Sequence, residues 1–282
     1  MSSVPRRIWP FALSLSLVLA VSVAYAQFGQ FGFRGRGFYR VPPRLPQADT
    51  FEGRFNFCRV MYRSWYREAG GTGWSTDYPD ADINFSIRLS ELTKTPVSFD
   101  REGEPRFVVV PIMDPALFRC PWAIVEDGGT ASFDDQEVQQ LRNYLLKGGF
   151  IWSDDFWGPR AWDNWEGQIA KVLPPDRYPV IDIPQDHVVY RTLFEVHKIP
   201  QIPSIQFWRQ SGGLLSERGK DSATVHFRGI NDEHGRLLVL MTHNTDIADG
   251  WEREGEDPNF FYSFSPDSYA VAINILMYAM SH

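Results

Sequence analysis

The stretch Leu141–Gly158, which reads LRNYLLKGGFIWSDDFWG, decides the fold of this 282-residue chain. Val138, Leu141 and Leu145 recur at i, i+3 and i+7, so they predict an amphipathic helix. Gly148 and Gly149 supply the residue of positive φ that ends such a helix. The apolar run 150–152 that follows predicts a short strand, buried in a sheet that is covered on both faces.

Polar side chains follow this predicted strand directly, at Ser153, Asp154 and Asp155. In open α/β sheets, ligands bind outside the carboxyl ends of the strands. The two acids are therefore candidate catalytic residues. Adjacent residues of an extended strand point to opposite sides, so the alternative is that only one faces a ligand while the other caps a helix or binds loop backbone.

Strand and helix patterns alternate on both sides of this stretch. Apolar strands are predicted near residues 55–62 and 106–113, and Phe85, Leu89 and Leu92 mark the helix between them. This alternation predicts an α/β fold with a mainly parallel sheet, a flavodoxin-like three-layer sandwich. Further elements follow from local signals: a strand at 180–183, helices at 132–147 (capping box Ser132 and Asp135), 160–172 and from Ser265 (N-cap, with Pro266 at N1), and a hairpin of 223–227 with 236–241.

The N-terminus predicts export. Arg6 and Arg7 precede an apolar run and then Ala24-Tyr25-Ala26, the pattern of a signal peptide over residues 1–26. An uncleaved anchor is the alternative, because the apolar run is close to the length that spans a bilayer. We expect a periplasmic protein, or one anchored in the membrane and facing the periplasm.

Residues 27–50 are rich in Gly, Arg and Pro, which predicts a linker before a folded domain over residues 51–282. The linker is basic, whereas the chain as a whole has a net charge of −7. An exported protein rarely meets RNA, so we expect no nucleic-acid partner. A spacer is the simplest interpretation, and contact with anionic lipid headgroups, as a membrane tether, or with wall polymers is the alternative.

The chain has two cysteines, Cys58 and Cys120. They can pair in an oxidising compartment, but a disulfide requires close Cβ atoms, which a sequence does not show. The favoured interpretation is two small buried apolar residues.

A second polar cluster follows the predicted strand 237–241. His243, Asp246 and neighbouring acids could join Asp154 and Asp155 around a divalent metal that activates water. The alternative is a loop held by Asx turns, with His243 as an ordinary hydrogen-bonding residue. The residues of this cluster are His243, Asn244, Asp246, Asp249, Trp251 and Glu252.

A third cluster precedes the helix that contains Phe85. Its aromatic residues could line a carbohydrate-binding groove together with Trp157 and Trp251, although core packing explains each of them as well. The residues are Trp74, Asp77, Tyr78, Asp80 and Asp82.

These motifs together resemble a bacterial family, domain of unknown function 4159, over residues 54 to 281. The segments that carry the resemblance are 73–85, 148–158 and 243–252. The resemblance implies an exported or membrane-tethered protein with a class I glutamine amidotransferase-like fold. Active enzymes of that superfamily place a cysteine on a strained turn, and here Asp154 or Asp155 holds the turn. Glutaminase activity through a cysteine is therefore not expected.

Three functions remain open from the sequence. The first is a binding or assembly module of the cell envelope, with an envelope protein or a glycan as partner and a polar cleft formed by Asp154, Asp155 and His243. The second is a metal-assisted hydrolase of a glycan or peptide, with Asp155 and His243 as metal ligand or catalytic base and Asp246 as a further ligand. The third is a carbohydrate-binding domain.

Overall fold

The computed structural model describes residues 41–68 and 70–282. The predicted signal peptide and the predicted linker up to residue 40 lie outside these residues. The compact unit begins at Pro43, a few residues before the predicted boundary at residue 51. Within the described part of the chain, no helix is both long and apolar enough to cross a membrane.

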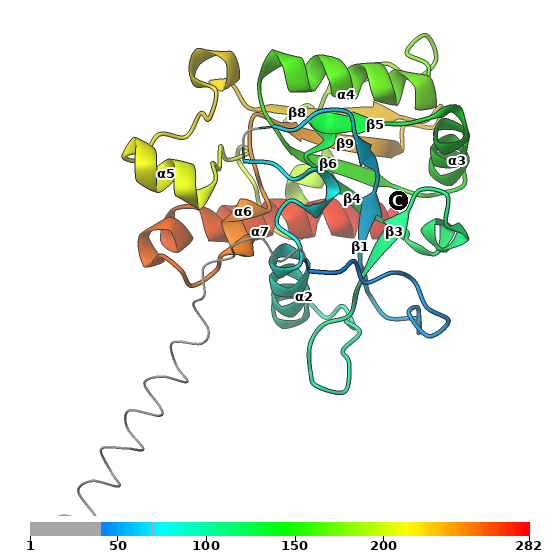
Figure 1. Cartoon of the computed structure of the whole chain (residues 1–282), viewed down its shortest axis with the longest axis horizontal. Coiled ribbons are helices and arrows are strands. Elements are labelled where there is room, and N and C mark those ends of the chain that lie inside the picture. The colour runs from blue at the N-terminus through cyan, green and yellow to red at the C-terminus, as the bar shows by residue number, and fades with distance from the viewer. Residues whose placement is uncertain (1–40, 69) are drawn as a thin grey trace, which may run out of the picture. The chain divides into compact units, whose positions relative to one another are not determined.

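Five short apolar runs form parallel strands at the centre of the domain (Figure 1). They are β1 (Phe57–Met61), β3 (Phe107–Pro111), β4 (Ala123–Glu126), β6 (Ile151–Phe156) and β9 (Leu237–His243). Their order in the sheet is β3-β1-β4-β6-β9. Counted along the chain this is 2-1-3-4-5, the strand order of flavodoxin-like folds. The predicted α/β class and mainly parallel sheet are confirmed.

Two more strands extend the sheet beyond β9. Strand β8 (His226–Asn231) is antiparallel to β9, and β7 (Val180–Asp182) is antiparallel to β8. The predicted hairpin is therefore present, with β8 beginning at His226. A separate two-stranded sheet pairs β2 (Arg63–Ser64) with β5 (Ala131–Ser132).

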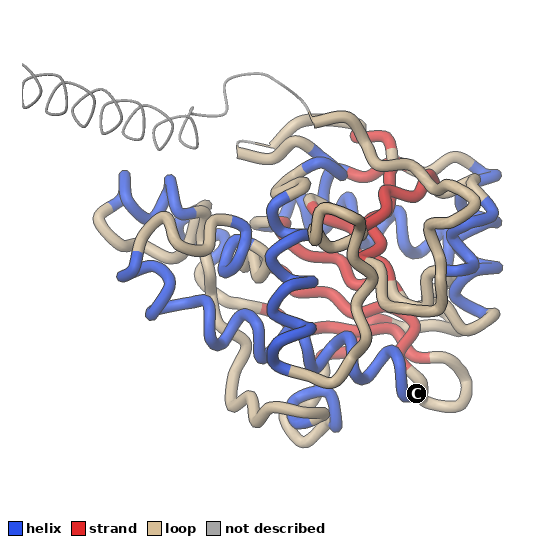
Figure 2. The backbone as a smooth tube through the Cα atoms, turned by 90° about the horizontal axis from the view of Figure 1, so that it is seen from below, coloured by secondary structure: helices blue, strands red, loops and turns tan. Residues whose placement is uncertain are grey.

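Helices cover both faces of the large sheet (Figure 2). One face carries α2 (Asp80–Leu92), α6 (Asp249–Glu252) and α7 (Pro258–Ser281), and the other carries α3 (Asp135–Leu146) and α4 (Gly158–Val172). The remaining helices of the described residues are α5 (Ile205–Ser211) and the 3-10 turns η1 (Gly73–Ser75), η2 (Pro115–Arg119), η3 (Gly128–Thr130), η4 (Val188–Arg191) and η5 (Gly219–Ser222).

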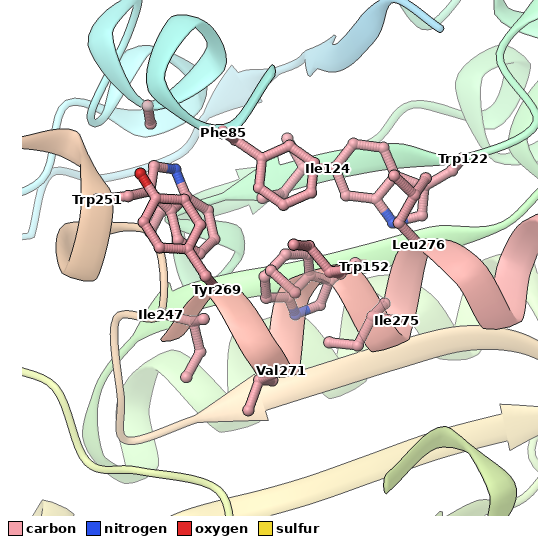
Figure 3. Close-up of a cluster of buried hydrophobic side chains, with 14 of the residues drawn as sticks. Phe85, Trp122, Ile124, Trp152, Ile247, Trp251, Tyr269, Val271, Ile275 and Leu276 are labelled. Carbon is pink, nitrogen blue, oxygen red and sulfur yellow. The ribbon is translucent and has the colours of Figure 1, made fainter. Parts of the chain in front are cut away.

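Alternation along the buried strands produces two cores. On the α2 and α7 face, Trp152 packs beside Trp122 and Trp251 (Figure 3). On the opposite face, Ile151 belongs to the core that includes Leu141 of α3. Because both faces are covered, the strands read as continuous apolar runs rather than as alternating ones.

The helix that precedes β6 ends as predicted but begins differently. Gly148 has φ +108° and follows the last turn of α3. Asp134 is the N-cap and forms a capping box with Glu137, so the predicted cap at Ser132 is wrong. Ser132 lies in β5, where it pairs with β2 instead.

The C-terminal helix also begins earlier than predicted. Asp257 is the N-cap of α7, Pro258 is the first helical residue, and Pro266 lies inside the helix. The prediction of an N-cap at Ser265 is wrong. Asp257 and Ser265 are both capping residues followed by a proline, and the helix begins at the first of these two signals. Ser265 is buried, and its hydroxyl donates to the backbone carbonyl of Gly250.

Cys58 and Cys120 form a disulfide, so the expectation of two unpaired cysteines is wrong. The bridge joins β1 to the segment before β4, with 62 residues of sequence separation. These two strands are neighbours in the sheet, which brings together positions that are distant in the sequence.

We expect the Cys58→Ala, Cys120→Ala double variant to lose about 2–4 kcal/mol in the free energy of unfolding, because the bridge closes a long loop of the unfolded chain. Urea unfolding with and without reductant measures the loss. The chain has no other cysteine, so the double variant should not respond to reductant. Equal stability of the oxidised and reduced wild-type protein would contradict the expectation.

Candidate functional site

Acidic side chains gather at the carboxyl ends of the parallel strands. Glu126 ends β4, and Asp155 lies near the end of β6. Asp246 and Asp249 follow β9, and Asp77 comes from the loop between η1 and α2. All five are buried or nearly so. The strand order therefore brings acids that are distant in the sequence together in one cluster.

The backbone turns sharply where these acids lie. In the described part of the chain, four residues other than glycine have positive φ: Asp77 (61°), Asp127 (48°), Asp155 (51°) and Asn244 (65°). Asp and Asn tolerate this conformation better than other side chains. The turn at Asn244 is held by its side chain, whose Oδ1 accepts from the backbone N–H of Gly158 (2.8 Å).

Asp154 holds the loop after β9. Its carboxylate accepts from the hydroxyl of Thr242 and from the backbone N–H of Ala248 (3.1 Å). Burial raises the pKa of Asp154 to about 7, although these hydrogen bonds oppose the increase. The side chain is fully buried, so it supports the site and is not accessible to a ligand.

Asp155 faces the other acids. The pairing of β6 with β9 shifts register between Ser153 and Phe156, and such irregularities redirect side chains. The Trp157 indole donates to Asp155 Oδ1 (3.0 Å). Burial, followed by the charges of Asp127 and Glu217, raises the pKa of Asp155 well above its usual range. Of the two predicted acids, Asp155 is the one aimed into the cluster.

Asp77, Asp246 and Asp249 form a candidate cation site. One carboxylate oxygen from each lies within 4.8 Å of the others. Asp246 Oδ1 accepts from the backbone N–H of Asp249 (2.9 Å), and Asp77 Oδ2 is buried without a hydrogen bond. Burial and the neighbouring acids raise the pKa of all three groups. Carboxylate oxygens are the ligands that Mg²⁺ and Ca²⁺ prefer.

A buried arginine supports one side of the cluster. Arg59 of β1 is fully buried, and its Nε donates to Asp82 of α2 (3.0 Å). Its guanidinium also donates to the backbone carbonyl of Thr76 (2.8 Å) and lies 3.8 Å from a Glu126 carboxylate oxygen. Both carboxylate oxygens of Glu126 are buried without a hydrogen bond. Arg59 therefore neutralises part of the acidic charge and fixes the loop before Asp77.

His243 lies in an aromatic cluster rather than among the acids. Its ring stacks on Phe156 and on His226, and its Nε2 is 3.1 Å from the backbone carbonyl of Gly158. Burial lowers the pKa of His243 to about 4. The predicted set Asp155, His243 and Asp246 is not the set of ligand atoms that the described residues bring together, which contains Asp246 alone of the three.

The predicted aromatic groove is mostly core. Trp251 is fully buried and Trp157 is 3% exposed. Trp74 is half-buried and packs edge-on against Tyr78. Asp80 is the first residue of α2. These residues surround the acids but do not form an exposed aromatic surface.

Glu126 and Asp127 are site residues that the sequence analysis missed, along with the whole of β4. The signal was present, because Ala123-Ile124-Val125 is an apolar run that ends in two acids, as 150–155 does. Asp127 Oδ2 accepts from the backbone N–H of Gly73 (2.8 Å), while its Oδ1 is buried without a partner. Tyr62 donates to the backbone carbonyl of Asp127 (2.7 Å) and so joins β1 to β4.

We expect the stability of the cation-free protein to fall as the pH rises from 6.5 to about 8. Burial raises the pKa of Glu68, Asp127 and Asp154 to about 7, whereas an unfolded carboxyl group has a pKa of about 4. The native state therefore binds more protons in this range. The stabilisation that these protonated carboxyl groups give to the native state is present below the unfolded pKa, and it is lost as the pH rises through their folded pKa of about 7. Denaturant unfolding at both pH values measures the change.

The Asp127→Asn variant is the control for this prediction. Its amide oxygen can still accept from Gly73 N–H, but the titration of Asp127 is removed while those of the other buried acids remain, so the dependence on pH should be shallower. The comparison starts at pH 6.5 because the lowered pKa of His243 acts with the opposite sign below that value. A variant with the same pH dependence as the wild type would contradict the assignment to Asp127.

Comparison with known proteins gives a family but no activity. No curated protein matches the chain. One family model, the domain of unknown function DUF4159, matches residues 56–280. This match includes every residue of the acidic cluster and confirms the resemblance found in the sequence. The chain belongs to the DUF4159 family.

Proposed function

We propose that this DUF4159 protein is an exported module of the cell envelope that binds a divalent cation at Asp77, Asp246 and Asp249. The observation that carries the proposal is the convergence of three carboxylates within 4.8 Å, those of buried Asp246 and Asp249 and of half-buried Asp77. Buried carboxylates without a counter-charge are costly, and a cation of high charge density removes that cost.

Unpaired oxygens around the three ligands support the proposal. Asp77 Oδ2, Asp127 Oδ1 and both oxygens of Glu126 are buried without hydrogen bonds. Buried polar atoms normally have partners, so an ion or ordered water at this edge of the sheet is expected. All of the ligand atoms are oxygens, which favours calcium, magnesium or manganese over zinc.

Export is supported by the disulfide as well as by the N-terminal sequence. Disulfides persist in oxidising compartments such as the periplasm, and both cysteines of the chain are paired. The same fact argues against a cysteine glutaminase, because neither cysteine offers a thiolate. The strand order and the positive φ of Asp155 before α4 support an amidotransferase-like fold in which an acid occupies the nucleophile position.

We expect the Asp246→Asn variant to bind Ca²⁺, Mg²⁺ or Mn²⁺ at least tenfold more weakly than the wild type. The amide keeps an acceptor for the Asp249 N–H but removes the charge. Calorimetric titration of chelator-treated protein measures the affinity. A cation at 100 times its Kd should also stabilise the wild-type protein by about 2.7 kcal/mol.

The matched control is Asp176→Asn, which removes an exposed acid beyond the C-terminal end of the 15-residue helix α4, whose N-terminal end follows Asp155, and it should bind as the wild type does. If millimolar concentrations of all three cations give neither heat of binding nor a change in Tm, the cation site is wrong. An equal loss in both variants would show a general charge effect rather than a site.

A metal-assisted hydrolase is the second candidate, and the position of Asp155 favours it. Asp155 is outside the three ligands but faces them, and its raised pKa suits a proton acceptor or donor. When bound, the cation would supply an activated water. In this case Asp155→Asn would keep cation binding and lose cation-dependent hydrolysis of glycan or peptide substrates. Hydrolysis that survives the substitution would remove Asp155 from the mechanism.

A further inference from the structure

A pocket of about 480 Å³ lies between α2 and the start of α7, away from the carboxylates of the cation site. Its volume falls in the range of small-molecule sites. Helix α2 lies beside α6 and α7 (Figure 1). The lining residues that determine the chemistry of the pocket are Asn84, Arg88, Glu91, Glu254, Phe261 and Tyr262.

An exposed aromatic surface forms one wall. The side chain of Tyr262 is 78% exposed, the largest value among the exposed large hydrophobic residues in the described part of the chain. Its ring packs edge-on against Phe261, with 5.4 Å between the centroids. Phe260 and Phe264 of the same helix fill the core, so the core does not require Tyr262. A flat, accessible ring provides a stacking face for an apolar surface that carries polar groups at its edge.

An ion-pair network forms the opposite wall. Arg88 donates to Glu91 (2.7 Å) and to Glu254 (Nε to Oε1, 3.0 Å). Asn84 Nδ2 donates to the backbone carbonyl of Trp251 (2.8 Å), which fixes α2 against α6. The side chains of Arg88 and Glu91 are still 37% and 52% exposed. Their geometry is set by these contacts before a ligand arrives, which reduces the entropy lost on binding.

The chemistry of the two walls restricts the ligand. Two carboxylates and one guanidinium give the pocket a net negative charge, which disfavours phosphates and other anions. A fully apolar ligand would desolvate three charged groups without replacing their hydrogen bonds. A hydroxyl group both donates and accepts, so it can bond to carboxylate and guanidinium alike. A sugar ring combines such hydroxyls with an apolar face.

We propose that the pocket between α2 and α7 binds a neutral saccharide, with Tyr262 as the stacking surface and Arg88 and Glu91 as hydrogen-bonding groups. None of Asp77, Asp246 and Asp249 lines this pocket. The proposal therefore does not use the cation ligands, and it moves the predicted sugar-binding role from buried Trp157 to exposed Tyr262.

The test uses the purified protein with cellohexaose, maltohexaose and chitohexaose as separate probes. Calorimetry and saturation-transfer NMR should detect binding of at least one of them, with the same affinity before and after chelator treatment. The Tyr262→Ala variant should bind that probe at least tenfold more weakly, and Arg88→Ala should also weaken it. Unchanged Tm for Tyr262→Ala would exclude loss of folding as the cause.

The control is Trp65→Ala, which removes an aromatic residue that is 68% exposed and lies outside the pocket. It should bind as the wild type does. The proposal is wrong if none of the probes binds at millimolar concentration, if Tyr262→Ala keeps wild-type affinity, or if Trp65→Ala loses as much. Cation binding by a protein that binds no probe would overturn this proposal and leave the cation site intact.

Discussion

This structure depends on one constraint, the repulsion among carboxylates. They are buried together at the carboxyl ends of the parallel strands. Asp77, Asp155 and Asp246 come from different segments of the chain, and burial together with the neighbouring acids raises the pKa of each. Arg59 offsets the charge of Asp82 and Glu126 most directly, and Arg253 offsets part of the charge of Asp249. The rest must be neutralised by protons or by a bound cation, because a fully ionised cluster would destabilise the native state.

The protein divides its acids into two kinds. Some receive dedicated donors, as Asp154 does from Thr242 and from the backbone N–H of Ala248. Asp154 thereby fixes the loop that follows β9. Asp77 keeps a buried oxygen without a hydrogen bond. A preorganised binding site combines unpaired charge with rigid loops. An ion pair of the core differs because its two partners neutralise each other.

Local sequence patterns predicted much of the fold, because each depends on neighbouring residues. The periods around Leu141 and Phe85 predicted α3 and α2, and the apolar runs predicted β1, β3, β6 and β9. The predictions failed where residues that are distant in the sequence determine the structure. The Cys58–Cys120 bridge depends on strand order, and the aromatic surroundings of His243 depend on its pairing with His226 across β8. The sequence predicted Asp246 as a ligand and placed Asp249 in the same cluster, but their partner Asp77 was identified by the fold.

The edge strands of the sheet are protected from pairing with the sheet of another copy. At one edge, the backbone carbonyl of Arg44 accepts from the N–H of Val109 in β3 (2.9 Å), and the Arg44 guanidinium covers Phe107. At the other edge, β7 is only three residues long. Covered and short edges resist pairing with a second sheet. The residues just before the predicted domain boundary therefore act as a guard against aggregation, and shortening the chain to residue 51 would uncover an apolar strand.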